Sequence, residues 1–444
     1  MIKIKSYFFH FILKEKENMV KDIKVKNKLL EDIIDKYISK IVEDSEKNVG
    51  FEETCATLLV LGEGYDFFAN KIEIDEIIYQ NMLKIKGAIT SGELYDRPSL
   101  YSGLTEVALS IYTVYKKTGY YKKFLDKINQ LLIEWTERYL KYIDVKNNIS
   151  TEYFDAIYGI SGITKYLLLF TEEEKMNNLS VKLLNILVYM SGYKKDGELL
   201  LPRWHIKNEN LRVERDRVNY PTGYLNFGVA HGIAGPLMVL GESYKKGIIV
   251  ENHFNAIANI VNEYKRCVYE LNGSTYWPNM LSPEQFLDNQ KNFHKEVNNE
   301  SWCYGAIGIA KVLLNTGICI EDHKLSNWAL SIIEQKSQLE IKELLLNSPT
   351  LCHGYAGVLS ILKSTYNIRA SSLLKQGMDK IEKQIINMYD ENSQYGFWNI
   401  ESSKNIGEIR EDKNTFLDGT AGIMLALLYA NECIGDTFMN KLVI

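Results

Sequence analysis

The chain has 444 residues, of which 25% are charged and 46% hydrophobic, and this is the composition of a globular protein rather than a disordered one. Its formal net charge is −5, which argues against non-specific binding to nucleic acid. Seven prolines are few for this length and favour long helices. The apolar runs fall short of the ~20 residues that span a bilayer, so we expect a cytoplasmic protein that reaches a membrane only peripherally, through a complex.

Amphipathic helices are expected along the whole chain. Apolar residues recur at i, i+3, i+4 and i+7 in residues 36–47, 124–143 and 373–389. A helix with one apolar face covers a core from outside, so these segments are predicted to form an outer layer.

A short repeat lies between these helices. It consists of a glycine, two further residues, usually a second glycine, and then an apolar helical stretch. The six copies begin at Gly103, Gly159, Gly232, Gly305, Gly354 and Gly419. The first copy has Glu106 in place of the second glycine. A helix that is apolar on nearly all sides belongs in the interior, and glycine lets backbones approach closely.

Pairing each apolar helix with an amphipathic one predicts an all-α protein, a double-layered α/α toroid (barrel) of six or seven helical hairpins in a single domain over residues 1–444. The alternative is a general helical bundle with chance glycines, which six copies in register disfavour. Residues 197–227 lack a helical period and are expected to form a small sheet-bearing insert that binds the leader part of a substrate. Polar stretches at 206–221, 285–300 and 401–413 each precede a repeat glycine and are expected to be long rim loops.

Chemically active residues precede the repeat glycines. One position before the glycine are Tyr158, His231, Tyr304, His353 and Asp418; two positions before it are Ile157, Ala230, Cys303, Cys352 and Leu417. Equivalent repeats would bring these positions into a circle around one mouth of the toroid, with Asp155 one turn earlier. Two thiols and an imidazole suit Zn²⁺ with one coordination position open, the ligand count of a catalytic site. Alternatively, the cysteines are buried apolar residues and His231 is a hydrogen-bonded core histidine.

The motifs at these positions resemble those of the lanthionine synthetase C-like family. They are AHGIAG at 230–235, SWCYGAIGIA at 301–310, LCHGYAGVL at 351–359, YFDAIYGISGI at 153–163 and LDGTAGI at 417–423. The resemblance implies an α/α toroid with one zinc ion per chain, held by Cys303, Cys352 and His353. It also implies acid/base roles for Asp155 and His231 and a place for Tyr304 in the catalytic pocket.

The resemblance further implies a stand-alone lanthipeptide cyclase of lantibiotic biosynthesis. Such an enzyme adds cysteine thiols to dehydroalanine or dehydrobutyrine in a dehydrated precursor peptide, leader plus core, and forms (methyl)lanthionine thioether rings. Its expected partners are a separate dehydratase and an export transporter. The chain departs from the family at Asn299, where members often carry an arginine; Arg203 and the arginines between 212 and 217 are candidate replacements.

Two other functions are compatible with a zinc-bearing helical ring. One is a non-catalytic scaffold that binds a peptide or glutathione. The other is a toroidal prenyltransferase-like enzyme or terpene cyclase, although the chain has no aspartate-rich DDxxD cluster. Turnover of a dehydrated peptide would separate these functions from a cyclase.

Overall fold

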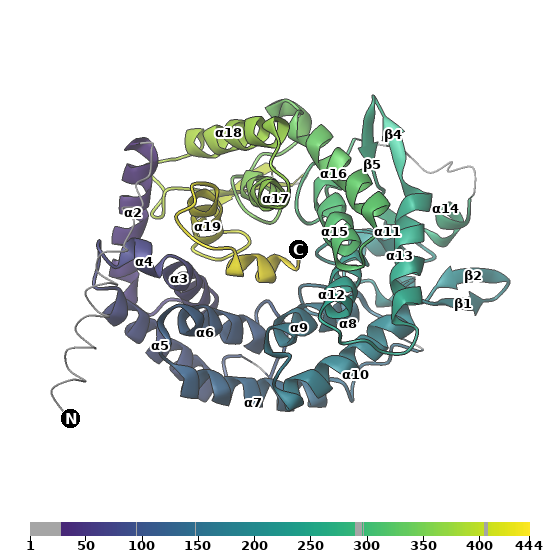
Figure 1. Cartoon of the computed structure of the whole chain (residues 1–444), viewed down its shortest axis with the longest axis horizontal. Coiled ribbons are helices and arrows are strands. Elements are labelled where there is room, and N and C mark those ends of the chain that lie inside the picture. The colour runs from purple at the N-terminus through teal and green to yellow at the C-terminus, as the bar shows by residue number, and fades with distance from the viewer. Residues whose placement is uncertain (1–27, 95, 147, 289–294, 296, 404–406) are drawn as a thin grey trace.

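The computed structural model describes residues 28–444, apart from 95, 147, 289–294, 296 and 404–406. Within these residues two concentric layers of helices form a ring (Figure 1). The inner layer contains α3 (Phe51–Glu63), α6 (Leu104–Thr118), α9 (Ile160–Leu167), α12 (Ala234–Lys245), α15 (Ala306–Cys319), α17 (Tyr355–Ile368) and α19 (Thr420–Ala430). The outer layer contains α2 (Lys28–Ser45), α5 (Ile74–Ser91), α7 (Lys122–Tyr139), α10 (Glu174–Met190), α13 (His253–Cys267), α16 (His323–Ser337) and α18 (Ser372–Asn387).

The inner helices close on themselves. Each one packs against the next in chain order, and α19 packs back against α3. The predicted all-α toroid is therefore confirmed, with seven hairpins in the described part of the chain. The seventh inner helix, α3, falls outside the glycine repeat, because Glu53 stands three residues after Gly50, where other copies have the second glycine.

The core lies between the layers and in the middle of the ring. The predicted amphipathic segments belong to α2, α7 and α18, whose apolar faces are buried. The 3₁₀ helix η4 (Thr437–Leu442) fills the centre and contacts α3, α6 and α9. Its Lys441 forms a buried ion pair with Glu106, and the Glu106 carboxylate also accepts the backbone N–H of Ser102 at 2.8 Å. Glu106 therefore replaces a repeat glycine because its charge is neutralised there.

The strands form two-stranded antiparallel pairs at the periphery. They are β1 (Tyr193–Asp196) with β2 (Leu199–Pro202), β3 (Leu225–Asn226) with β6 (Met280–Leu281), β4 (Tyr269–Leu271) with β5 (Ser274–Tyr276), and β7 (Asn399–Ser403) with β8 (Gly407–Glu411). Short helices complete the connections: α4 (Tyr65–Phe68), α8 (Thr151–Phe154), α11 (Glu214–Asn219), α14 (Pro283–Leu287), η1 (Leu168–Phe170), η2 (Asn208–Asn210) and η3 (Ile341–Leu344).

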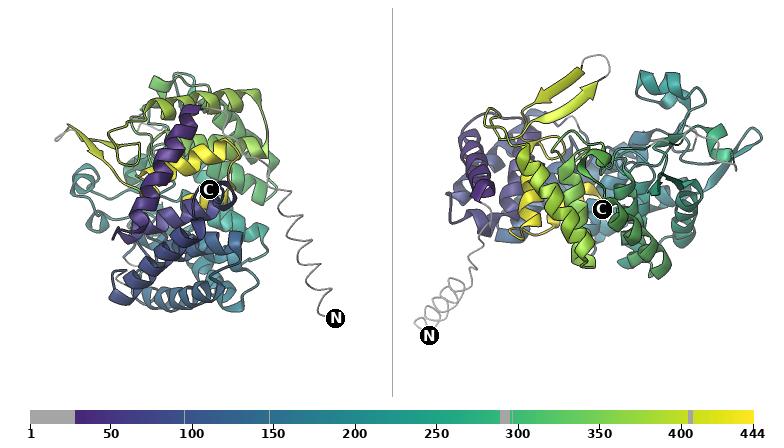
Figure 2. Two further views of the ribbon diagram at one scale, coloured as in Figure 1. Left: turned by 90° about the vertical axis from the view of Figure 1, so that its left-hand side faces the viewer. Right: turned by 90° about the horizontal axis from the view of Figure 1, so that it is seen from above.

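The rim segments differ in part from expectation. The prediction of a loop at 401–413 is wrong, because most of this stretch is hairpin β7–β8, whose strands pair from Asn399↔Glu411 to Ser403↔Gly407. Residues 206–221 contain η2 and α11, and they project from the same end of the ring as β7–β8 (Figure 2). The stretch 285–300 lies partly outside the described residues. None of the described helices has the length and apolar character required to cross a bilayer.

The repeat glycines allow the turn before each inner helix to fold back onto that helix. A Cβ added to Gly305 would lie 2.2 Å from the backbone nitrogen of Ser301, and one added to Gly308 would lie 2.2 Å from the carbonyl oxygen of Trp302. Both distances are far inside van der Waals contact, and backbone atoms cannot rotate away as side-chain tips do. The glycine pair therefore fixes the position of the turn that carries Cys303.

We expect Gly308→Ala to lower the free energy of unfolding by about 1–3 kcal/mol or more, because the added methyl group overpacks the turn. The matched control is Gly87→Ala in α5, where an added Cβ meets no atom within 4 Å. Gly87→Ala should raise the free energy of unfolding by up to about 1 kcal/mol, since alanine favours a helix over glycine. Urea titrations of both variants measure the difference, and equal stability of the two would contradict the close-approach argument.

Candidate functional site

Backbone hydrogen bonds join the turns that precede successive inner helices. In each bond, the acceptor is the carbonyl oxygen of the residue two positions before a repeat glycine. The donor is a backbone N–H in the turn that precedes the previous inner helix in the chain. The bonds are Tyr101 N to Ile157 O (3.2 Å), Ala156 N to Ala230 O (3.1 Å), Val229 N to Cys303 O (2.8 Å), Cys303 N to Cys352 O (3.3 Å) and Cys352 N to Leu417 O (3.1 Å). Residues far apart in sequence are thereby held side by side at one mouth of the ring. We refer to these bonds as the turn-to-turn bonds.

Side chains that could bind a metal ion meet where the turns before α15, α17 and α19 touch. The thiol of Cys352, the ring of His353 and the carboxylate of Asp418 offer ligand atoms that lie within 4.8 Å of one another. Cys303 joins this group through a hydrogen bond between its sulfur and the Cys352 thiol, and the Ser301 hydroxyl lies 3.4 Å from the Cys303 sulfur. The structure therefore groups Cys352 and His353 with Asp418, and Cys303 reaches this group through its hydrogen bond to Cys352.

The sulfur and imidazole nitrogen atoms of this group are of the kinds that zinc prefers as ligands. The buried Nε2 of His353 has no hydrogen-bond partner among the described residues, although Glu401 Oε1 is 3.2 Å away. The hydrogen bond from Cys352 lowers the pKa of the Cys303 thiol, while burial opposes this effect. Thiolate is the form that binds metals. The same hydrogen bond and burial raise the pKa of the Cys352 thiol, so the pair loses its first proton easily and its second with difficulty. An unsatisfied imidazole nitrogen beside a thiolate is a suitable environment for Zn²⁺.

His231 lies on another part of the same mouth and is held by Asp155. Asp155, which is fully buried, accepts Nδ1–H of His231 at 2.7 Å with one carboxylate oxygen. Its other oxygen accepts the backbone N–H groups of Tyr158 and Gly159, both at 2.7 Å. All the Asp155 hydrogen bonds thus serve to fix the carboxylate and the ring, and Nε2 of His231 is the nitrogen left for chemistry.

The environment of His231 favours its protonated form. Burial alone would lower its pKa, but the hydrogen bond and negative charge of Asp155 outweigh burial, so the pKa is raised above its usual value. The side chain remains 37% exposed, so a substrate can reach it. An accessible histidine whose protonated form is favoured is suited to donating a proton.

Aromatic residues form the wall of the site near His231. The ring of Tyr158 stacks on the imidazole with centroids 6.2 Å apart. The hydroxyl of Tyr304 accepts a hydrogen bond from Asn226 Nδ2 at 3.0 Å, and burial raises the pKa of this phenol. Tyr304 therefore keeps its proton at neutral pH and can donate a hydrogen bond from the pocket wall.

The sequence patterns did not assign a role to two carboxylates that the structure places beside His353. Asp418 stands at the position before a repeat glycine and could have been included on that ground. Glu401 could not have been predicted as a neighbour of His353, because it reaches His353 only through the pairing of β7 with β8, which the sequence did not indicate.

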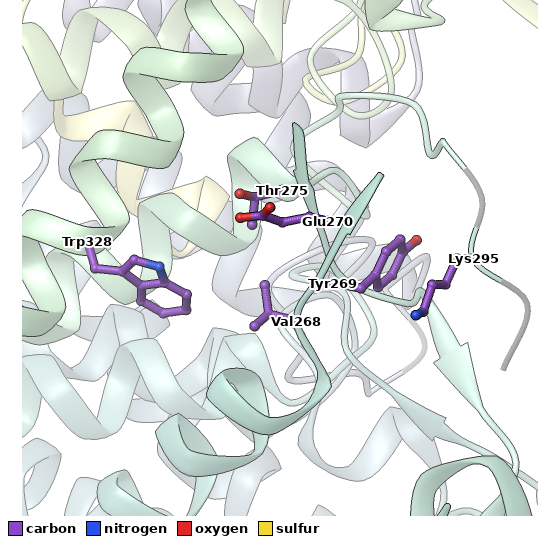
Figure 3. A pocket seen from close by; sticks show the side chains of 6 residues that line it. All are labelled: Val268, Tyr269, Glu270, Thr275, Lys295 and Trp328. Carbon is purple, nitrogen blue, oxygen red and sulfur yellow. The ribbon is translucent and has the colours of Figure 1, made fainter. Parts of the chain in front are cut away.

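A separate pocket lies on the outer side of the ring, beside the hairpin β4–β5 (Figure 3). Its volume is about 310 Å³, and it is lined by Val268, Tyr269, Glu270, Thr275, Lys295 and Trp328. None of the predicted site residues lines this pocket, so the chemistry described above lies elsewhere, at the mouth.

Comparisons with known proteins agree with this arrangement. The family model described as "Lanthionine synthetase C-like protein" matches residues 54–433. The "Nisin biosynthesis protein NisC" of Lactococcus lactis subsp. lactis is 27% identical over 344 residues, which is 77% of this chain and 76% of that protein. The solved structure titled "Nisin cyclase" superposes with a TM-score of 0.73 at 24% identity, covering 93% of this chain and 100% of that one, and it supports the fold.

We expect Asp155→Asn to lower the pKa of His231, because the amide removes the negative charge yet keeps a carbonyl oxygen for the two backbone N–H groups. Nuclear magnetic resonance of the histidine ring carbons across pH measures this pKa. A group with a raised pKa in the fold contributes stability below its unfolded pKa of about 6.5 and loses it as the pH rises through the folded pKa.

The stability difference between the wild type and Asp155→Asn should therefore be largest in acid and shrink toward alkaline pH. An unchanged His231 pKa in the variant would show that Asp155 does not control this histidine.

Proposed function

Because this chain belongs to the lanthionine synthetase C-like family, we propose that it is a lanthipeptide cyclase that closes thioether rings at the mouth described above. Its substrate is a dehydrated precursor peptide, in which a cysteine thiol adds to dehydroalanine or dehydrobutyrine. The observation that carries this proposal is that Cys352 lies beside His353 and hydrogen-bonds Cys303, at the mouth that also holds the His231–Asp155 pair. A nucleophilic addition followed by protonation requires these two kinds of group side by side.

Cys303, Cys352 and His353 would hold one zinc ion, which supplies Lewis-acid chemistry by lowering the pKa of a thiol so that the thiolate is present at neutral pH. Three protein ligands leave one position free, as catalytic zinc sites do. Asp418 is expected to lie outside the ligand set, because a fourth protein ligand would close that position.

His231 carries the proton in the reaction. The substrate thiolate forms a bond from sulfur to the β-carbon of the dehydro residue, and the electron pair of the carbon–carbon double bond moves to the amide carbonyl oxygen. His231 Nε2 then gives its proton to the α-carbon, and the carbonyl is restored. The proton released by the next substrate thiol returns His231 to its acid form, so protons balance over one cycle.

Asp155 acts through His231 rather than on the substrate. Its burial and its three hydrogen bonds place it out of reach of an incoming thiol. A carboxylate near a histidine could either orient the histidine or deprotonate the incoming thiol, and these contacts support the orienting role. Tyr304 lines the pocket and offers its hydroxyl proton to a peptide carbonyl.

The insert at 197–227 is proposed to bind the leader of the precursor. It exposes apolar side chains that the ring does not cover: Leu199 (41% exposed), Leu200 (56%), Val213 (50%) and Val218 (70%). Exposed apolar side chains in one segment are typical of a surface that contacts another chain. A separate dehydratase and an export transporter are the proposed partners, in the cytoplasm and at the membrane periphery.

Purified protein should contain about one zinc per chain. We expect Cys303→Ala, Cys352→Ala and His353→Ala each to lose the metal, because two remaining ligands hold it weakly. Cys319→Ala is the matched control: this free cysteine in α15 lies outside the cluster, and its variant should keep full zinc. Asp418→Asn should also keep zinc. Metal analysis by mass spectrometry reads all five variants, and full zinc in Cys303→Ala would overturn the ligand assignment.

His231→Ala should keep its zinc and its melting temperature but close rings about 10²–10⁴-fold more slowly, which is the usual contribution of a general acid or base. Alkylation of free thiols in a dehydrated precursor, counted by mass spectrometry, measures ring closure. If His231→Ala loses zinc, the histidine is a ligand. If it closes rings at the wild-type rate, another group protonates the α-carbon.

Replacing residues 197–227 by a short linker should weaken binding of the full precursor while zinc content stays at one per chain. Calorimetric titration with precursor peptide gives the affinity, and a leader-free core peptide serves as the control ligand. An unchanged affinity for the full precursor would refute the leader-binding role of the insert.

A further inference from the structure

The proposed reaction places negative charge on a peptide oxygen, to which Tyr304 offers only a neutral hydroxyl and for which no permanently charged residue has been described so far. When the thiolate adds, the electron pair moves onto the amide carbonyl oxygen before the α-carbon is protonated. Stabilising an oxyanion of this kind is among the largest contributions that an active site makes. A permanently charged group near His231, where the proton is delivered, would add to this stabilisation.

Arg212 is such a group. It lies between η2 and α11 in the insert, and its guanidinium carbon is 5.3 Å from the centre of the Tyr158 ring. Tyr158 in turn stacks on His231, with the two ring planes at 27°. Arg212 also forms an ion pair with Glu152, which belongs to the short helix that leads into Asp155. The insert thus brings one positive charge over the aromatic wall of the acid/base pair.

The other arginines of the insert are engaged elsewhere. Arg203 stacks on Tyr189 at 4.2 Å and donates to the Tyr189 carbonyl, so it faces α10. Arg217 donates to the Leu211 carbonyl at 2.8 Å. Arg215 is 81% exposed beside Asp216.

The charge of Arg212 also reaches His231 electrostatically. Burial and Asp155 have the largest effects on the pKa of His231, and Arg212 acts on it as a smaller, lowering influence. Arg212 similarly lowers the pKa of Tyr158, against the larger effect of burial. Both effects agree with the 5.3 Å distance between the guanidinium and the Tyr158 ring.

We propose that Arg212 is a catalytic residue of the cyclase, whose guanidinium stabilises the oxyanion formed when the substrate thiolate adds. The proposal rests on the proposed function. Its side chain is 62% exposed without substrate, and an exposed charge in water stabilises little. A peptide that covers the mouth excludes water, and the same charge then interacts more strongly with the developing anion.

The test compares steady-state ring closure in Arg212→Gln, Arg212→Lys and the control Arg138→Gln. Arg138 is a matched residue on the outer helix α7: it is 51% exposed and pairs with Asp96 as Arg212 pairs with Glu152. We expect kcat of Arg212→Gln to fall by about 10²-fold, as when one oxyanion-stabilising group is removed. Arg212→Lys should recover part of the loss because it keeps the charge, and Arg138→Gln should match the wild type. Zinc content and melting temperature should be the same in all four proteins.

Three outcomes would overturn the role of Arg212. Wild-type kcat in Arg212→Gln would show that no charge is required there. A rise in KM with unchanged kcat would make Arg212 a peptide-binding residue. Equal losses in Arg212→Gln and Arg212→Lys would show that the charge is not what matters. If the wild type itself closes no rings, the proposed function fails instead, and the two failures are thereby distinguished.

Discussion

The turns before α6, α9, α12, α15 and α17 each donate a backbone N–H to a carbonyl of the next turn around the ring, and these turn-to-turn bonds position the candidate site. The carbonyl oxygens of Cys303 and Cys352 are themselves acceptors in the series. The two cysteines whose thiols are proposed to bind zinc therefore also hold neighbouring repeats together through their backbones. A shift of one turn would move a ligand and break a hydrogen bond at the same time, which makes the position of the ligands as rigid as the ring.

Two other features of the ring support these bonds. The glycine pairs let the turns lie against the helix starts, as the 2.2 Å approaches at Gly305 and Gly308 show. The central 3₁₀ helix η4 fills the space that a ring of helices leaves, and its Leu442 carbonyl accepts the indole N–H of Trp302 at 2.9 Å, directly beside Cys303. The framework of the site is thus built from close backbone packing and hydrogen bonds.

Much of this arrangement could be predicted from the sequence because the repeat carries its own register. Counting back from each glycine predicts that Cys303, Cys352, His353 and His231 share one mouth, and the structure places them there. The count could not identify Glu401, which depends on pairing in a hairpin, nor Arg212, which depends on the path of an irregular insert. Contacts between repeats can be predicted by comparing equivalent positions in the sequence. Contacts made by an insertion depend on how it folds back on the ring, which the repeat does not indicate.

The site divides into a sulfur-rich part at Cys303 and Cys352 and an acid/base part at Asp155 and His231, joined by the turn-to-turn bonds. Zinc K-edge X-ray absorption of the protein loaded with one zinc per chain tests this division most directly. Two sulfur neighbours at about 2.3 Å, one imidazole nitrogen at about 2.0–2.1 Å and one further light atom are predicted, with the same spectrum in His231→Ala. Fewer than two sulfur neighbours, or loss of an imidazole contribution in His231→Ala, would contradict the assignment of Cys303, Cys352 and His353 as the metal ligands and His231 as the acid.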